Sequence, residues 1–184
     1  MLKLRPVITF LRNIRKYHRF IGISLSALFI ISALTGVLLA YKKHINFIQP
    51  KTQSSIHSEA QDMDYMSIDS LIQIAKQSAV VKADQAQIDR LDIRPKKGIA
   101  KVLFKDLNWE IQLDLRTGEV LSQQARYSDL IERIHDGSII SDGFKVGSMS
   151  ILGLGLIILT ISGISLWFGP KYIRRQKNIT NTLE

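Results

Sequence analysis

The chain has 184 residues, a formal net charge of +9 and no cysteine, which excludes disulfides, thiolate metal sites and cysteine nucleophiles. The excess positive charge lies at the two ends of the sequence. Residues 42–145 carry fifteen basic and fifteen acidic side chains and are neutral. This distribution argues against nucleic-acid binding, because a nucleic-acid-binding domain concentrates positive charge on its own folded surface.

The N-terminal segment, residues 1–19, contains six basic side chains and no acidic one. Its apolar residues recur at the i, i+3, i+4, i+7 spacing of one helix face. They are Val7, Phe10, Leu11 and Ile14. We predict a basic amphipathic helix, which either lies on the anionic inner leaflet or simply begins the first membrane helix.

Two stretches, residues 20–41 and 146–168, contain no acidic, basic or histidine side chain. Each has about the ~20 residues that an α-helix needs to cross a bilayer, so we predict two transmembrane helices. The first is longer than the apolar core of a usual signal peptide and is predicted to be a retained anchor. The tail, residues 169–184, has four basic side chains and one acidic one. Positive flanks predict a two-pass bacterial inner-membrane protein with both termini in the cytoplasm and a periplasmic central part.

The central part begins with a polar stretch, residues 42–66, which we interpret as a tether between the membrane and a folded domain. Residues 67–126 are predicted to form that domain. Ser67 is a plausible N-cap for a helix with one apolar face, and from Ile88 onward the apolar period changes to two. One helix followed by a meander of strands predicts a two-layer α+β domain.

The acidic residues of the predicted strands alternate with the apolar ones. They are Asp92, Glu110, Asp114 and Glu119. We interpret them as a solvated face of the sheet. Residues 127–145 are predicted to be a helix and loop at the outer surface of the membrane, with Asp136-Gly137 ending the helix. The fold class is therefore membrane α+β, a two-helix transmembrane hairpin enclosing a small extracytoplasmic domain with a helix packed on an antiparallel sheet.

Small residues form a stripe along each predicted span. In the first span they are Gly22, Ser26, Ala33, Gly36 and Ala40, and in the second Gly153, Thr160 and Gly163. Such stripes permit close packing of helices, so we expect the two spans to pack along them. Recruitment of a second subunit, or room for a porphyrin face, is the alternative.

Three histidines lie at predicted membrane boundaries: His18 inside, and His44 and His135 outside. A membrane haem b needs two facing imidazole ligands, and His44 and His135 are the pair that shares one side. A His18 ligand would need a second subunit. The simpler interpretation is that these are ordinary interface residues, with His135 at a helix C-terminus. His57 is interpreted as a surface residue.

The order of motifs along the chain resembles the PepSY-associated transmembrane family, in a short two-span version. The matching residues are Lys16-Tyr17-His18-Arg19-Phe20-Ile21-Gly22, the strand Trp109–Asp114, the turn Thr117-Gly118-Glu119-Val120 and Ile134-His135-Asp136-Gly137. The resemblance implies a PepSY domain at residues 67–121. Histidines at the positions of His18 and His135 recur in the family, which suggests both as haem ligands.

Larger members of the family include iron-regulated membrane proteins and haem-containing ferric-siderophore reductases. The resemblance therefore implies an accessory of iron or siderophore uptake that passes electrons through haem. Two alternatives stay open. One is a non-catalytic periplasmic binding module, for which the resemblance to PepSY domains implies regulation of peptidases. The other is a structural subunit of a homo-oligomer or membrane complex. The sequence contains no recognised catalytic or metal-site motif, so we do not expect an enzyme from the residues alone.

Overall fold

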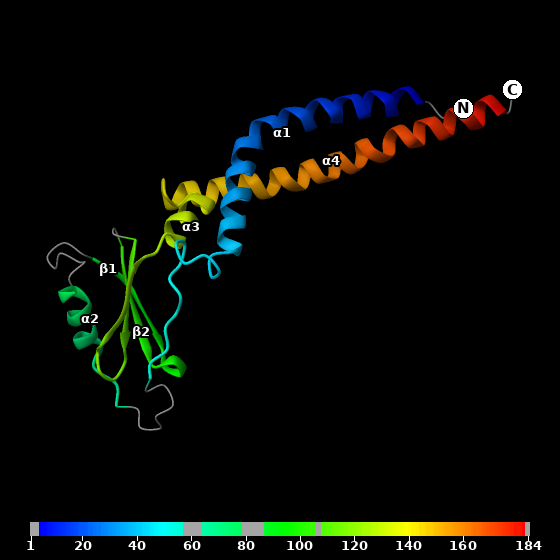
Figure 1. Cartoon of the computed structure of the whole chain (residues 1–184). Helices are drawn as coiled ribbons and strands as arrows, with labels where there is room; N and C mark the ends of the chain where they lie inside the picture. Colours follow the sequence, from blue (N-terminus) through cyan, green and yellow to red (C-terminus); the bar gives the residue numbers. More distant parts are fainter. Residues whose placement is uncertain (1–3, 57–63, 79–86, 106–107, 183–184) are drawn as a thin grey trace. The chain divides into compact units, whose positions relative to one another are not determined.

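The computed structural model describes residues 4–56, 64–78, 87–105 and 108–182. The elements follow the order α1 (Leu4–Ala40), α2 (Ile68–Gln77), β1 (Ile88–Arg94), a short 3-10 helix η1 (Pro95–Lys97), β2 (Ile99–Phe104), β3 (Trp109–Asp114), β4 (Val120–Ala125), α3 (Ser128–Asp136) and α4 (Asp142–Thr182) (Figure 1). The chain divides into two compact units. We call residues 1–34 with 134–184 the helical unit, and residues 35–133 the sheet unit.

The two long helices, α1 with 37 residues and α4 with 41, each contain a window apolar enough to cross a membrane, with mean hydropathies of 2.3 and 2.2. Both helices are longer than the predicted spans. A helix of this length extends about 55 Å or more at 1.5 Å per residue, well beyond a ~30 Å hydrocarbon core. The basic segment before Phe20 is thus helical and continuous with the first span, and Figure 1 shows that α1 bends along its length.

Within the helical unit, α1 and α4 run antiparallel and meet through glycines. Gly22 faces Leu159, Gly155 faces Leu25, and Gly169 faces Leu11. A methyl group added to Gly169 would lie 2.5 Å from the Leu11 side chain, and one on Gly155 would overlap Leu25. Close approach of backbones at small residues is the usual basis of helix packing in membranes.

The predicted small-residue stripes are only partly confirmed by these contacts. Gly22 and Gly163 lie at the contact, but nothing lies within 4 Å of a methyl group built on Gly153. Gly155 and Gly169 take its place. For each pair of facing residues on α1 and α4, the two sequence numbers sum to about 180. The contacts therefore displace α1 along α4, compared with an arrangement in which residues 20–41 match residues 146–168 over their full length.

The sheet unit is a four-stranded antiparallel meander in the order β1-β2-β3-β4. The turn between β1 and β2 is η1 followed by Gly98, whose φ of 62° is readily adopted by glycine. The turn between β3 and β4 contains Gly118 with φ 70°. These turns and the two central strands, β2 and β3, confirm the predicted meander.

One face of the sheet is apolar and packs against α2, which begins after Ser67 as predicted. The Ser67 hydroxyl oxygen accepts a hydrogen bond from the Ser70 backbone N–H at 3.2 Å. The buried core combines residues of α2 with alternate residues of β2 and β3 and with the residue after β3. Its members are Leu71, Ala75, Ala100, Val102, Phe104, Ile111, Leu113 and Leu115.

Candidate functional site

The second face of the sheet is polar and buried, and it holds an ionic cluster at its centre. Lys101 on β2 and Glu110 on β3 have fully buried side chains, with 2.8 Å between Nζ and Oε1. Gln112, two residues along β3, donates a hydrogen bond to the same Glu110 oxygen at 2.8 Å. The alternation of a strand brings these three side chains to one face, because β2 and β3 pair Lys101 with Gln112 directly.

The other carboxylate oxygen of Glu110 accepts a hydrogen bond from Arg126, just after β4, at 2.5 Å. Arg126 also bonds Asp129 of α3 at 3.2 Å, and Asp129 pairs with Arg90 of β1 at 3.2 Å. We call Lys101, Glu110, Gln112, Arg126 and Asp129 the polar cluster. It links β2, β3 and the residue after β4 to α3, with the buried carboxylate of Glu110 at its centre.

The polar cluster perturbs the ionisation of its cations in opposite directions. Burial lowers the pKa of Lys101, although its hydrogen bond and charge pairing with Glu110 oppose the shift. Burial also disfavours the charged form of Arg126, but the hydrogen bond to Glu110 and the charge of Asp129 outweigh it and raise the pKa of Arg126. Glu110 therefore compensates two cations that have left bulk water.

Residues 48–55, which we call the strap, cover this polar face. Gln112 donates to the Lys51 carbonyl at 2.9 Å and accepts from the Gln53 N–H at 2.8 Å. Ser55 donates its backbone N–H to the Lys97 carbonyl at 2.8 Å and its hydroxyl to Asp114. The strap belongs to the stretch predicted as a tether, and it is part of the folded sheet unit.

The predicted solvated face is wrong for Glu110 and Asp114, which are 1% and 3% exposed, whereas Glu119 is exposed. Polar alternation along a strand looks the same whether water or another chain segment meets the polar side chains. The types of side chain could have indicated the burial. Lys101 and Gln112 occupy directly paired positions, and both can form hydrogen bonds with the nearby Glu110.

His18 of α1 lies in the helical unit against α4. Its Nδ1 is 2.7 Å from the Ser162 hydroxyl oxygen, and that hydroxyl donates to the Ile158 carbonyl at 2.7 Å. If the Ser162 hydroxyl donates to Ile158, its oxygen is an acceptor for an Nδ1–H of His18. Gly163 makes room for the ring, since a methyl group there would lie 3.7 Å from its Cε1.

His135, near the end of α3, also lies in the helical unit. Its Nδ1 is 3.0 Å from the Ser32 carbonyl oxygen of α1. A carbonyl can only accept, so Nδ1 of His135 is the donor of this hydrogen bond. His18 and Ser32 are separated by about 21 Å of helix at 1.5 Å per residue, so His18 and His135 of one chain do not form a pair.

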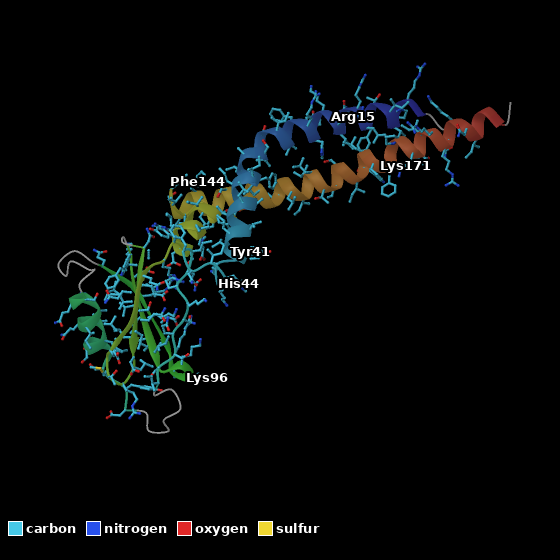
Figure 2. All side chains as sticks on the ribbon, in the orientation of Figure 1. Arg15, Tyr41, His44, Lys96, Phe144 and Lys171 are labelled. Atoms are coloured by element: carbon cyan, nitrogen blue, oxygen red, sulfur yellow. The ribbon has the colours of Figure 1, made fainter. Side chains whose placement is uncertain are left out.

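His44 belongs to the sheet unit, in the turn that follows α1. Its exposed ring is 6.5 Å from that of Tyr41 in an edge-on arrangement, and both residues are labelled in Figure 2. The proposed pairing of His44 with His135 stays a prediction. His57 lies outside the described residues. Among the described residues, no group of three or more histidine or acidic side chains could hold a metal ion.

The structure thus defines a membrane protein with two long apolar helices and a small α+β domain between them in sequence. The family model described as the PepSY-associated TM region matches residues 15–182, and the chain belongs to this family. No curated protein matches the sequence.

Proposed function

We propose that this protein is a haem-carrying accessory of iron or siderophore uptake in the bacterial inner membrane, with both termini in the cytoplasm and the sheet unit in the periplasm. The basic flanks of both apolar stretches support this orientation. The chain belongs to the PepSY-associated family. The link to iron uptake is an inference from the resemblance to larger, iron-regulated members of that family.

The observation that carries the haem proposal is the shared hydrogen bonding of His18 and His135 through Nδ1. Each ring has its Nδ1 within hydrogen-bond distance of an oxygen on the neighbouring long helix, at 2.7 and 3.0 Å. Histidine ligands characteristically donate their second ring N–H to a carbonyl or another acceptor, which orients the ring and raises the basicity of the ligand.

Haem b, when bound, supplies one-electron transfer. The donor types fit this group, but the separation of His18 from His135 means that the two would not ligate the same haem within one chain. Each would need another histidine to hold the haem. For His18 this histidine would come from a second copy of the chain, and for His135 it would be His44 or a histidine of a second copy.

The test is titration of the purified full-length protein in detergent with ferric haem, followed by optical spectroscopy of the oxidised and reduced forms. We expect a stoichiometric six-coordinate low-spin spectrum. His18→Ala or His135→Ala should convert the bound haem to a five-coordinate species or abolish binding. Ser162→Ala should weaken binding by about tenfold with an unchanged spectrum, since it removes only the orienting partner.

The matched control is His57→Ala, which removes a histidine predicted to lie on the surface. A spectrum that is unchanged in the His18, His44 and His135 variants would contradict the assignment of the ligands. Absence of a stoichiometric band in the unsubstituted protein would contradict haem binding itself.

A second candidate function is a periplasmic binding or peptidase-regulating module, and the composition of β4 favours it. Among the described strands this edge strand pairs with β3 alone, and it contains no charged residue and no proline. Charges and prolines are the usual protection of an edge against pairing, and an unprotected edge can accept an extended peptide as an added strand.

A photo-reactive residue at Gln124 of β4 would test this function in native membranes, with Asp89 on the opposite edge strand β1 as the control position. Both side chains are exposed. We expect a discrete crosslinked partner from position 124 only. Equal labelling from both positions would contradict strand addition at β4.

A further inference from the structure

The strap, drawn in cyan in Figure 1, contacts the polar face of the sheet mainly through atoms of its own backbone. The Lys51 carbonyl accepts a hydrogen bond from the Gln112 side chain at 2.9 Å, and the Gln53 N–H donates to the same side chain at 2.8 Å. The Ser55 N–H donates to the Lys97 carbonyl at 2.8 Å. Every residue has a backbone carbonyl and every residue except proline has an N–H, so these contacts depend little on the sequence of the bound segment.

Gln112 is a buried side chain whose orientation suits it to bind an extended backbone. It is 0% exposed, and its Nε2 also donates a hydrogen bond to Glu110 Oε1 at 2.8 Å. This bond fixes the amide, so that its nitrogen faces the carbonyl of Lys51 and its oxygen faces the N–H of Gln53. Alternate residues of an extended chain direct their backbone groups to the same side, and Gln112 binds two such residues at once.

The two halves of the strap are attached in different ways. In the first half Ile48 and Pro50 are buried. The second half, residues 51–55, contains no apolar side chain and buries only Ser55, whose hydroxyl donates to Asp114. Hydrogen bonds therefore hold the second half, and their net strength is modest because water replaces them on release.

The surface beneath the strap is polar, so it can be stable in water as well as under a bound chain. It contains Gln112 and the ion pair of Lys101 with Glu110. Release of residues 51–55 would hydrate these groups rather than expose apolar surface. The apolar core lies on the other face of the sheet, against α2, and does not include the strap. The second half can therefore detach while the domain stays folded.

We propose that the polar face of the sheet is a binding site for an extended polypeptide, and that residues 51–55 occupy this site in the structure. The ligand is a segment that offers Gln112 a carbonyl and, two residues later, an N–H. A serine two residues further on binds Asp114. The site lies on the face of the sheet, separate from the edge strand β4, and it does not depend on haem. A partner that binds there would displace the strap.

The experiment uses the full-length protein in detergent and a fluorescent synthetic peptide with the sequence of residues 48–56. Gln53→Pro with Ser55→Glu, which we call the released-strap variant, removes the N–H that bonds Gln112 and places a carboxylate against the buried Asp114. By fluorescence anisotropy we expect saturable binding to this variant, about tenfold tighter than to the unsubstituted protein, in which the strap competes. N-methylation of the peptide nitrogen of Gln53 should weaken binding by about tenfold, because it leaves a buried acceptor unpaired.

Two further substitutions in the released-strap variant locate the site. Gln112→Leu should abolish peptide binding, and Gln124→Leu, at an exposed position of β4, should leave it unchanged. Equal loss of binding in both would overturn the proposal in favour of strand addition at the β4 edge. Binding that does not respond to N-methylation would also overturn it, since backbone contacts would then not hold the peptide.

A second measurement uses the unsubstituted protein and so does not require the released-strap variant to fold. Excess peptide should accelerate hydrogen exchange at the protein's own Gln53 amide, because the peptide competes with the strap for Gln112. The N-methylated peptide should have no such effect. Exchange at Gln53 that excess peptide leaves unchanged would overturn the proposal, as would absence of saturable binding to a released-strap variant whose β2 and β3 amides remain protected.

Discussion

The helical unit and the sheet unit treat their charged side chains in opposite ways. In the sheet unit, Glu110 is buried and bound on both oxygens by Lys101, Gln112 and Arg126 of the same chain. In the helical unit, Lys16 and Arg19 are exposed in a region without acidic residues. The sheet unit thus compensates its central buried charge internally, whereas the helical unit combines an internal pair, Lys145 with Asp136, with an N-terminal basic segment that has no acidic residue close to it in sequence. The membrane-compatible helices belong to the helical unit, and a membrane surface with anionic head groups attracts exposed cations near it.

The largest expected effect comes from breaking the internal compensation of the sheet unit. Glu110→Gln would leave Lys101 buried without its anion and would remove one of the two anions of Arg126, which keeps Asp129. We expect a loss of about 3–5 kcal/mol in the free energy of unfolding. Denaturant titration of the full-length protein, followed by Trp109 fluorescence in a Trp167→Phe background, measures it. The exposed Glu119→Gln should change stability by no more than about 0.5 kcal/mol. Equal stability of the two variants would show that the polar cluster is not a unit.

The next effect concerns the packing of α1 on α4. Gly155→Leu would collide with Leu25 and should cost about 1–3 kcal/mol of helix packing. Because the chain contains no cysteine, disulfide formation between Gly22→Cys and Leu159→Cys reports the contact directly. Gly153→Leu is the control, since its position has open space. Loss of crosslinking in both variants would contradict the observed pairing.

Removing the hydrogen bonds that hold the strap should cause a comparable or smaller loss of stability. Gln112→Leu removes the partners of the Lys51 carbonyl and the Gln53 N–H and should cost about 1–3 kcal/mol. Hydrogen exchange should show faster exchange at the Gln53 amide, with the strands still protected. Gln124→Leu, at an exposed position of β4, should leave the strap unchanged. Uniform loss of protection would mean that the strap and the sheet unfold together.

The smallest expected effect is a pH dependence of the local stability where α3 connects to α4. The hydrogen bonds from Lys145 and Ser138 outweigh burial and lower the pKa of Asp136 from 3.8 to about 2. The pair therefore contributes its full stabilisation above about pH 4, and this is lost as the pH falls through 2. Exchange of the Ser138 amide should accelerate over that range and not in Asp136→Asn, which already lacks the carboxylate. Identical profiles in both proteins would contradict this origin.

Much of the sheet could be predicted because its signals are local. The period of two in Trp109–Asp114, the turn at Gly98 and the N-cap Ser67 depend on backbone geometry within a few residues. The candidate site could not be predicted in the same way. Neither the hydrogen bond of His18 to Ser162 nor the burial of Glu110 follows from residues close to it in sequence.

The sequence by itself determined the two membrane-compatible stretches, the placement of charge outside them and the meander of strands, because hydrophobicity, charge and periodicity are properties of short segments. The tertiary structure decided which surfaces are covered. Only the return of residues 48–55 across the sheet buries its polar face, and only the contacts of Gly155 and Gly169 set the register of α1 on α4. Such long-range contacts depend on the complementary shapes of segments that are far apart in the chain.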